Sequence, residues 1–138
     1  MSDRPEKMFR KEISSLPDIF RFVAQRMSSL KVDESDRVWA DLVVEELFTN
    51  TVKYSSGGRD VEIRIDGDEE KLRVRLTDFD VDAFDITKLA PRVDTTLPVT
   101  ERTPGGLGLH LVRESSDAVL YEYANRNSVI TVTKRLGR

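Results

Sequence analysis

Two short runs of alternating apolar residues constrain the fold of this chain more than any other feature. A charged turn containing Gly67 and Asp68 separates them. Alternation with a period of two puts every apolar side chain of a strand on one face of a sheet. The runs therefore predict an antiparallel hairpin with one buried face. The alternating residues are Val61, Ile63 and Ile65 in the first run and Leu72, Val74 and Leu76 in the second.

Two amphipathic helices are predicted before this hairpin. The segment Ser15-Leu16-Pro17-Asp18 is typical of a helix start, and apolar residues follow it at helical spacing as far as Leu30. A second start signal, Asp33 with Asp36 three residues later, opens a longer helical pattern that ends near Tyr54. Both helices therefore have one apolar face to bury.

The remaining segments predict further strands, one more helix and a long loop. We predict a short first strand over Met8 to Ser14, a helix start at residues 105–108, and a second hairpin around Asn125-Arg126-Asn127. Periodicity is lost between Phe79 and Thr103. A loop of that length inside a compact domain suggests a functional lid.

Helices that precede and interrupt an antiparallel sheet predict an α+β fold. We expect a two-layer sandwich in which helices cover one face of a mixed, mainly antiparallel sheet. A chain of 138 residues has the size of one ordinary domain, so a single domain over residues 1–138 is predicted.

Composition excludes several kinds of function. The chain has no cysteine, which excludes disulfides, thiolate zinc sites and cysteine nucleophiles. Its 22 basic residues are spread along the chain against 25 acidic ones, so direct binding of nucleic acid is not expected. No apolar run approaches the roughly 18 residues of a membrane span. A cytoplasmic protein without a membrane partner is the expectation.

The longer helix carries the most informative polar pair. A rotation of 100° per residue places Glu46 and Asn50 about 40° apart, on the apolar side of the helix. Burying a carboxylate and an amide is costly unless partners satisfy them, and a divalent cation with its waters would satisfy both. Hydrogen bonds to a neighbouring loop are the alternative and the commoner case.

Two further features are weak when taken alone. Gly105-Gly106-Leu107-Gly108 precedes a predicted helix, where free amides and the helix dipole favour a phosphate, although glycines before a helix more often only form a turn. Asp78 ends a predicted strand, from which its carboxylate could accept a hydrogen bond from a ligand's amino group. Exposed aspartates at strand ends are common, however.

The order of these features resembles three sequence boxes of the histidine-kinase, gyrase and heat-shock-protein ATPase superfamily. The boxes correspond to Glu46-Leu47-Phe48-Thr49-Asn50, to Asp78 and to Gly105-Gly106-Leu107-Gly108-Leu109. Within that superfamily the chain is most similar to the anti-sigma regulatory serine/threonine kinases, over about residues 9 to 136. The residues that carry this narrower likeness are Phe84-Asp85, Leu97-Pro98, the run from Gly105 to Arg113, and Asp117, Tyr121, Asn127 and Lys134.

The resemblance implies a Bergerat-type fold with a site for ATP and Mg²⁺. In such a site Asn50 coordinates the magnesium, Glu46 acts as general base or positions the attacking group, and Asp78 recognises adenine. The glycine-rich segment from Gly105 to Leu109 binds phosphates through the backbone amides of Gly106 and Gly108.

The resemblance also implies partners. The family's kinases phosphorylate a serine or threonine of an anti-sigma-factor antagonist in a partner-switching pathway, and the unoccupied kinase binds a sigma factor. Many relatives are dimers, so a homodimer is a further expectation.

Several positions depart from the family pattern. The family usually has glycine two residues after the aspartate, where this chain has Asp80. Asp82 lies two residues further on, and these carboxylates either face solvent or hold a second cation. The alternative to a kinase is therefore a degenerate, non-catalytic module that acts only by binding proteins, as an anti-sigma factor or partner-switch regulator. His110 is expected to pack. Either Thr131 or Thr133 is the threonine expected near adenine.

Overall fold

The computed structural model describes residues 4–88 and 106–136, with the side chains of residues 106 and 107 left out of the description. Leu97-Pro98, Gly105 and most of the predicted lid therefore lie outside the described residues. The elements in chain order are β1 (Glu6–Arg10), the 3₁₀ helix η1 (Ile13–Ser15), α1 (Leu16–Leu30), α2 (Glu34–Tyr54), β2 (Asp60–Gly67), β3 (Lys71–Asp78), the 3₁₀ helix η2 (Ile86–Lys88), α3 (Gly106–Ser115), β4 (Ala118–Ala124) and β5 (Asn127–Arg135).

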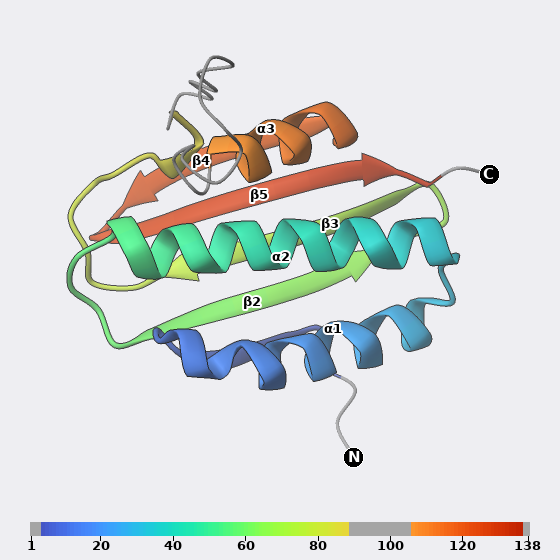
Figure 1. The fold of residues 1–138 in the computed structure, drawn as a ribbon, viewed down its shortest axis with the longest axis horizontal. Coiled ribbons are helices and arrows are strands. Elements are labelled where there is room, and N and C mark those ends of the chain that lie inside the picture. Colours follow the sequence, from blue (N-terminus) through green and yellow to red (C-terminus); the bar gives the residue numbers. More distant parts are fainter. Residues whose placement is uncertain (1–3, 89–105, 137–138) are drawn as a thin grey trace, which may run out of the picture.

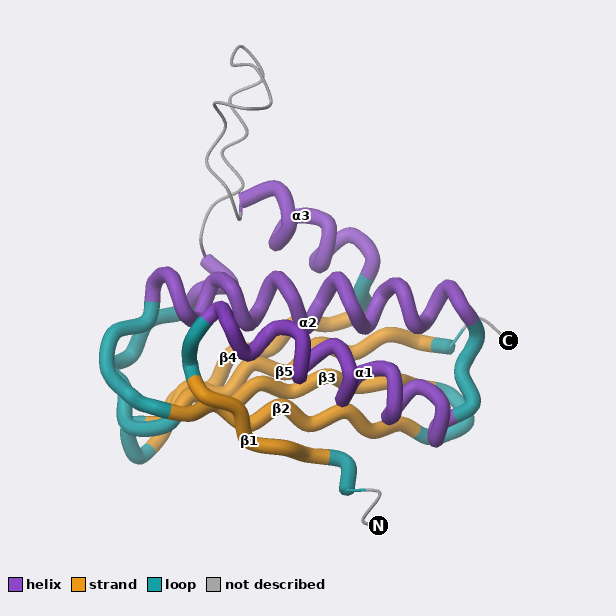
Figure 2. Tube along the Cα trace, turned by 60° about the horizontal axis from the view of Figure 1, so that its bottom comes forward, coloured by secondary structure: helices purple, strands orange, loops and turns teal. Residues whose placement is uncertain are grey.

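The described chain forms two layers, with the helices on one face of a single sheet (Figure 1; Figure 2). The sheet has five strands in the order β1-β2-β3-β5-β4. The predicted α+β sandwich is confirmed. Our prediction of a mixed sheet differs from the structure, because every pairing among the described strands is antiparallel. Two of these pairings are hairpins, which can only be antiparallel.

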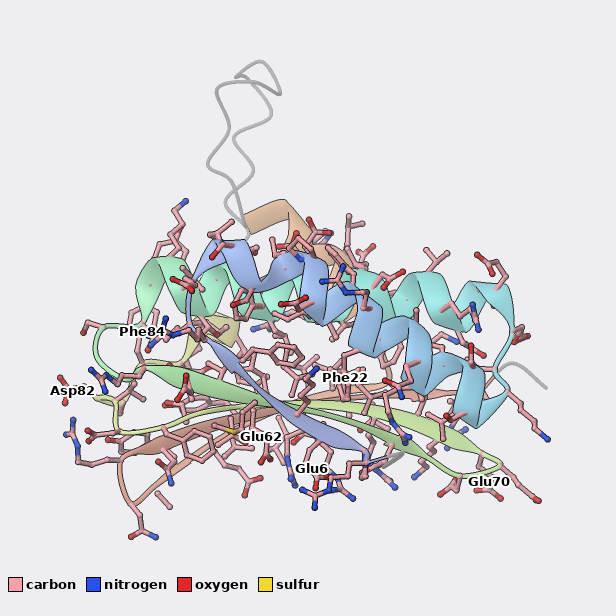
Figure 3. All side chains as sticks on the ribbon, turned by 90° about the horizontal axis from the view of Figure 1, so that it is seen from below. Glu6, Phe22, Glu62, Glu70, Asp82 and Phe84 are labelled. Atoms are coloured by element: carbon pink, nitrogen blue, oxygen red, sulfur yellow. The ribbon has the colours of Figure 1, made fainter. Side chains whose placement is uncertain are left out.

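The core lies between the two layers. Phe22 of α1 points into it, whereas Glu6 and Glu62 project from the opposite face of the sheet (Figure 3). That outer face carries ion pairs such as Arg64 with Glu6 and Arg73 with Asp66. Pairs as exposed as these contribute little to stability, so the buried apolar layer holds the fold together. Its largest fully buried side chains are Phe48, Ile19, Met27, Leu47, Ile63, Ile65, Leu72 and Leu76.

The turn between β4 and β5 fixes the register of the last hairpin. Asn125 and Arg126 both have positive φ, at 54° and 63°. Two consecutive left-handed residues match the right-handed twist of the flanking strands. The predicted second hairpin is therefore confirmed, with Asn127 as the first residue of β5.

The predicted first strand was placed too late in the sequence. Instead of Met8 to Ser14, the strand spans Glu6–Arg10, and a 3₁₀ turn follows it. The hydroxyl of Ser15 donates to the carbonyl of Arg10 at 2.8 Å, which closes this turn and directs the chain into α1. A local side-chain bond of this kind competes with continued strand pairing.

The start of α2 was predicted correctly, but the role of its carboxylates was not. Asp33 is the N-cap residue and makes no side-chain capping bond. Asp36, with only 3% of its side chain exposed, accepts a 2.7 Å bond from Lys134 Nζ of β5. This pair ties the first turn of α2 to the end of the sheet. Within residues 4–88 and 106–136, no helix has the length and apolarity that crossing a membrane requires.

Candidate functional site

The polar residues singled out by the sequence meet at one end of the sandwich. They come from the second half of α2, the end of β3, the start of β5 and the segment after β3. Asp82 and Phe84 of that segment lie at this end of the molecule, and Glu70 in the β2–β3 turn lies at the other (Figure 3).

Asn50 faces inward, as predicted, and only 2% of it is exposed. Its amide nitrogen donates to the backbone carbonyl of Glu46 at 2.6 Å, and Glu46 Oε2 lies 3.4 Å from the same nitrogen. Among the described residues, the nitrogen is therefore bonded to its own helix. This leaves the carbonyl oxygen of the amide as the atom that could ligate a cation, and such oxygens suit Mg²⁺.

Glu46 is half-buried between α2 and the first turn of α3. A Cβ atom at position 108 would collide with the Glu46 carboxylate, so only glycine lets α3 approach so closely. Burial is the main cause that raises the pKa of Glu46, and the neighbouring charge of Glu45 adds to it, against a lowering by the Asn50 hydrogen bond. A carboxylate with a raised pKa accepts protons more readily near neutral pH.

Part of the glycine-rich segment, from Gly106 onward, lies within the described residues. Gly106 is the first residue of α3, so the segment does lead into a helix, as predicted. The first amides of a helix lack partners within it and attract anions. Leu109 is 4% exposed and packs in the core with Val112. Its side chain therefore anchors α3, and only its backbone could contact a ligand.

Asp78 is buried, and not an exposed strand-end residue. Its Oδ2 accepts hydrogen bonds from Ser55 Oγ at 2.5 Å and from Lys11 Nζ at 3.1 Å. Its Oδ1 is also buried and has no hydrogen-bond partner within the described part of the chain. Buried acceptors without a partner are rare because they lose their hydration without compensation. A ligand with an amino group would satisfy this oxygen.

A small pocket surrounds Asp78. Phe84 forms part of its wall and stacks on Tyr54, with ring centroids 6.4 Å apart. The pocket measures about 10 Å³, which is room for about one water, so an adenine ring would enter only after the wall moves. The lining residues are Thr51, Ser55, Leu76, Asp78, Phe84, Ile86, Ser128 and Ile130.

The hydroxyl from β5 that lies near Asp78 belongs to Ser128, so our prediction of Thr131 or Thr133 was wrong. Ser128 is the register partner of Asp78 and is 7% exposed. Thr131 and Thr133 pair with Arg75 and Arg73 on the outer face of the sheet. Because side chains alternate along a strand, the buried residues Ile130 and Val132 already place position 128 on the inner face. The alternation is present in the sequence, but it identifies Ser128 only once β5 is known to pair with β3.

The structure also shows how Asp80 replaces the family's glycine. Its φ of 55° is the left-handed conformation that glycine adopts without strain, so the backbone path is kept. Arg126 pairs with Asp80 at 2.9 Å and with Asp82 at 3.1 Å, and both carboxylates are more than four-fifths exposed. They therefore face solvent, and their partner is a guanidinium. These two hydrogen bonds raise the pKa of Arg126.

His110 does not pack into the core as predicted. It lies on the surface of α3 with 42% of its side chain exposed, and its Nε2 is 3.1 Å from Glu114. In the described ranges no cluster of three or more metal-ligating residues of the histidine, cysteine or carboxylate type occurs. A Mg²⁺ site at Asn50 would therefore need oxygens from phosphates and water, which is how this ion commonly binds beside nucleotides.

Comparison with known proteins agrees with this geometry. The family model described as "Histidine kinase-like ATPase domain" matches residues 9–134. Among solved structures, the Acinetobacter baumannii histidine kinase AdeS is similar with a TM-score of 0.53 and 14% sequence identity, and the match covers 99% of this chain and 70% of that chain. A comparison with curated protein sequences found no match. The predicted Bergerat-type fold is confirmed by the structural similarity.

Proposed function

We propose that this chain, which belongs to the histidine kinase-like ATPase domain family, is an anti-sigma regulatory kinase that transfers phosphate from ATP to a protein serine or threonine. Family membership indicates ATP binding. The kinase activity, the antagonist that accepts the phosphate, the sigma factor bound by the unoccupied form and a homodimeric state are our proposals.

The observation that carries nucleotide binding is the buried Oδ1 of Asp78 without a partner in the described chain. It lies at the strand end where the family reads adenine, and the 6-amino group of adenine is a donor of the kind it needs. Thr51, Ser55 and Ser128 add hydroxyl groups around it, and Leu76 and Ile130 add apolar walls. The residues present therefore fit a purine base.

The part of the site formed by α2 and the start of α3 has groups that suit the phosphates of ATP. Asn50 offers an amide oxygen to Mg²⁺, and the first amides of α3 offer hydrogen bonds to phosphate oxygens. When bound, ATP would supply the γ-phosphoryl group, and Mg²⁺ would neutralise the negative charge on the phosphate oxygens during transfer. Glu46, held against Gly108, would accept the proton of the attacking serine or threonine hydroxyl as the hydroxyl oxygen bonds to the γ-phosphorus. The bond from that phosphorus to the bridging oxygen would break at the same time, and ADP would leave.

Thermal unfolding with and without nucleotide tests the proposal. At an ATP concentration 100 times the dissociation constant, and with Mg²⁺ present, the free energy of unfolding is expected to rise by about 2.7 kcal/mol. Asn50→Ala removes the metal ligand, so its stabilisation by ATP will no longer depend on Mg²⁺. Wild-type protein whose unfolding midpoint is unchanged by ATP and Mg²⁺ would contradict nucleotide binding.

The degenerate binding module is a second candidate, favoured by the aspartates at positions 80 and 82 and by the closed pocket beside Asp78. Asp80→Gly separates the two candidates. If the chain is an active kinase, this change will leave ATP affinity within about threefold, because Asp80 already has the glycine-like conformation and is paired with Arg126. Calorimetry measures the affinity. ATP binding that appears only in Asp80→Gly would support the degenerate module.

A further inference from the structure

Lys11 forms a buried ion pair with Asp78, the residue proposed to bind the purine base. It follows directly after β1, and only 6% of its side chain is exposed. Its ammonium group donates to Asp78 Oδ2 at 3.1 Å, to Ser55 Oγ at 3.0 Å and to the carbonyl of Gly57 at 2.8 Å. An ammonium has three donors, so these three bonds use all of them.

Ser55 completes the arrangement. Its oxygen accepts from Lys11, so its own hydrogen is free to donate to Asp78 Oδ2, 2.5 Å away. Oδ2 therefore receives two hydrogen bonds while Oδ1 receives none from the described residues. The two oxygens of the Asp78 carboxylate therefore differ in their hydrogen bonding. One is fixed by the protein, and the other is left to accept from a ligand.

We infer that Lys11 and Ser55 are positioning residues that make Asp78 select purines carrying a 6-amino group, an inference that rests on the proposed nucleotide binding. A carboxylate only accepts hydrogen bonds. Adenine offers a donor at position 6, whereas guanine offers a second acceptor that would face Oδ1 without a hydrogen between them. Lys11 supplies the countercharge that a carboxylate needs in a buried place.

The loop after α2 contributes to this orientation through its backbone. Gly57, whose carbonyl accepts from Lys11, has a φ of 88°. A Cβ atom at Gly58 would lie 2.6 Å from the carbonyl oxygen of Phe79 and 3.3 Å from Asp78 Oδ1. The two glycines therefore let the loop lie close against the aspartate, and they bring the Gly57 carbonyl within reach of Lys11.

A pair of nucleotides that differ only in the amino group isolates the role of Lys11. Calorimetry measures the dissociation constants of ATP and of purine riboside triphosphate, which lacks the 6-amino group, both with Mg²⁺. Wild-type protein is expected to prefer ATP by about tenfold or more, the usual effect of a hydrogen bond to a charged group. In Lys11→Met this preference will fall to within about threefold, because ATP binding weakens while binding of the analogue stays nearly constant. A purely structural role would weaken both nucleotides equally.

One further variant allows for loss of folding in Lys11→Met, and another is a surface control. Lys11→Met leaves a buried carboxylate without its countercharge and is destabilising. Ser55→Ala keeps the ion pair and removes one bond to Oδ2, so it carries the test if Lys11→Met does not fold, with an expected loss of about half the preference on a logarithmic scale. Lys71→Met changes an exposed lysine at the far end of β3 and will keep the wild-type preference.

The measured dissociation constants distinguish failure of the inference from failure of the proposed function. Folded Lys11→Met and Ser55→Ala variants that keep the full preference for ATP would overturn the inference. Wild-type protein that binds both nucleotides equally well would also overturn it, while the proposed nucleotide binding would stand. Wild-type protein that binds neither nucleotide would remove the proposed function and, with it, the inference.

Discussion

Glu46→Gln is expected to lower the rate of phosphate transfer by about 100- to 10,000-fold, the usual contribution of a general base. Glutamine keeps the size of the side chain and its contact with Gly108, but it cannot take a proton from the attacking hydroxyl. ATP affinity should stay close to wild type, since Asn50 and Asp78 are unchanged. Single-turnover transfer from labelled ATP to a serine-containing acceptor protein measures the rate.

Glu45→Gln is the matched control, because it makes the same chemical change one residue away on the exposed side of α2. It is expected to keep most of the activity. Equal losses in both variants would mean that Glu46 has no special role. Since the charge of Glu45 raises the pKa of Glu46, the control should also shift the activity profile toward lower pH.

The direction of the pH effect follows from the raised pKa of Glu46. A base works only when deprotonated, so activity will begin to fall, on acidification, at a pH above the ordinary glutamate value of 4.5. Folded protein also holds the Glu46 proton more tightly than unfolded protein, so this group's contribution to stability decreases as pH rises from 4.5 through its folded pKa. Glu46→Gln removes that decrease. The variant should therefore be no less stable than wild type at neutral pH.

Phe48→Ala is expected to lower the free energy of unfolding by about 3–5 kcal/mol, through lost burial and the cavity left behind. Phe48 lies between Glu46 and Asn50 on α2, and its exposure is 0%. A loss of this size is a large part of the roughly 5–15 kcal/mol that holds a domain together. Urea unfolding followed by circular dichroism gives the value.

Val38→Ala on the same helix serves as the comparison. Val38 is 60% exposed, so its loss should change stability by less than about 0.5 kcal/mol. If Phe48→Ala lowered the free energy of unfolding no more than Val38→Ala, Phe48 would not be part of a packed interface between α2 and the sheet. If the expected difference is found, the position of Asn50 can be attributed to the same packing, because Phe48 and Asn50 are on one rigid helix.

Much of the site was predictable because its residues belong to regular elements. Helical periodicity alone put Asn50 on the buried side of α2, and the strand pattern put Asp78 at the end of β3. Other parts were not predictable in this way. The strand alternation that places Ser128, and not Thr131 or Thr133, beside Asp78 becomes useful only when β5 is known to pair with β3. The exposed position of His110 likewise depends on which side of α3 meets the core.

The sequence by itself determined the order of helices and strands, the hairpins and the inward direction of the α2 polar residues, since local periodicity and turn residues specify these. Only the tertiary structure decided which distant groups meet. Lys11 and Asp78 are 67 residues apart in the chain, and Arg126 and Asp80 are 46 apart. No local pattern encodes such pairs. Their contacts form only when packing of the helices on the sheet and the register of its strands bring the ends of separate elements together.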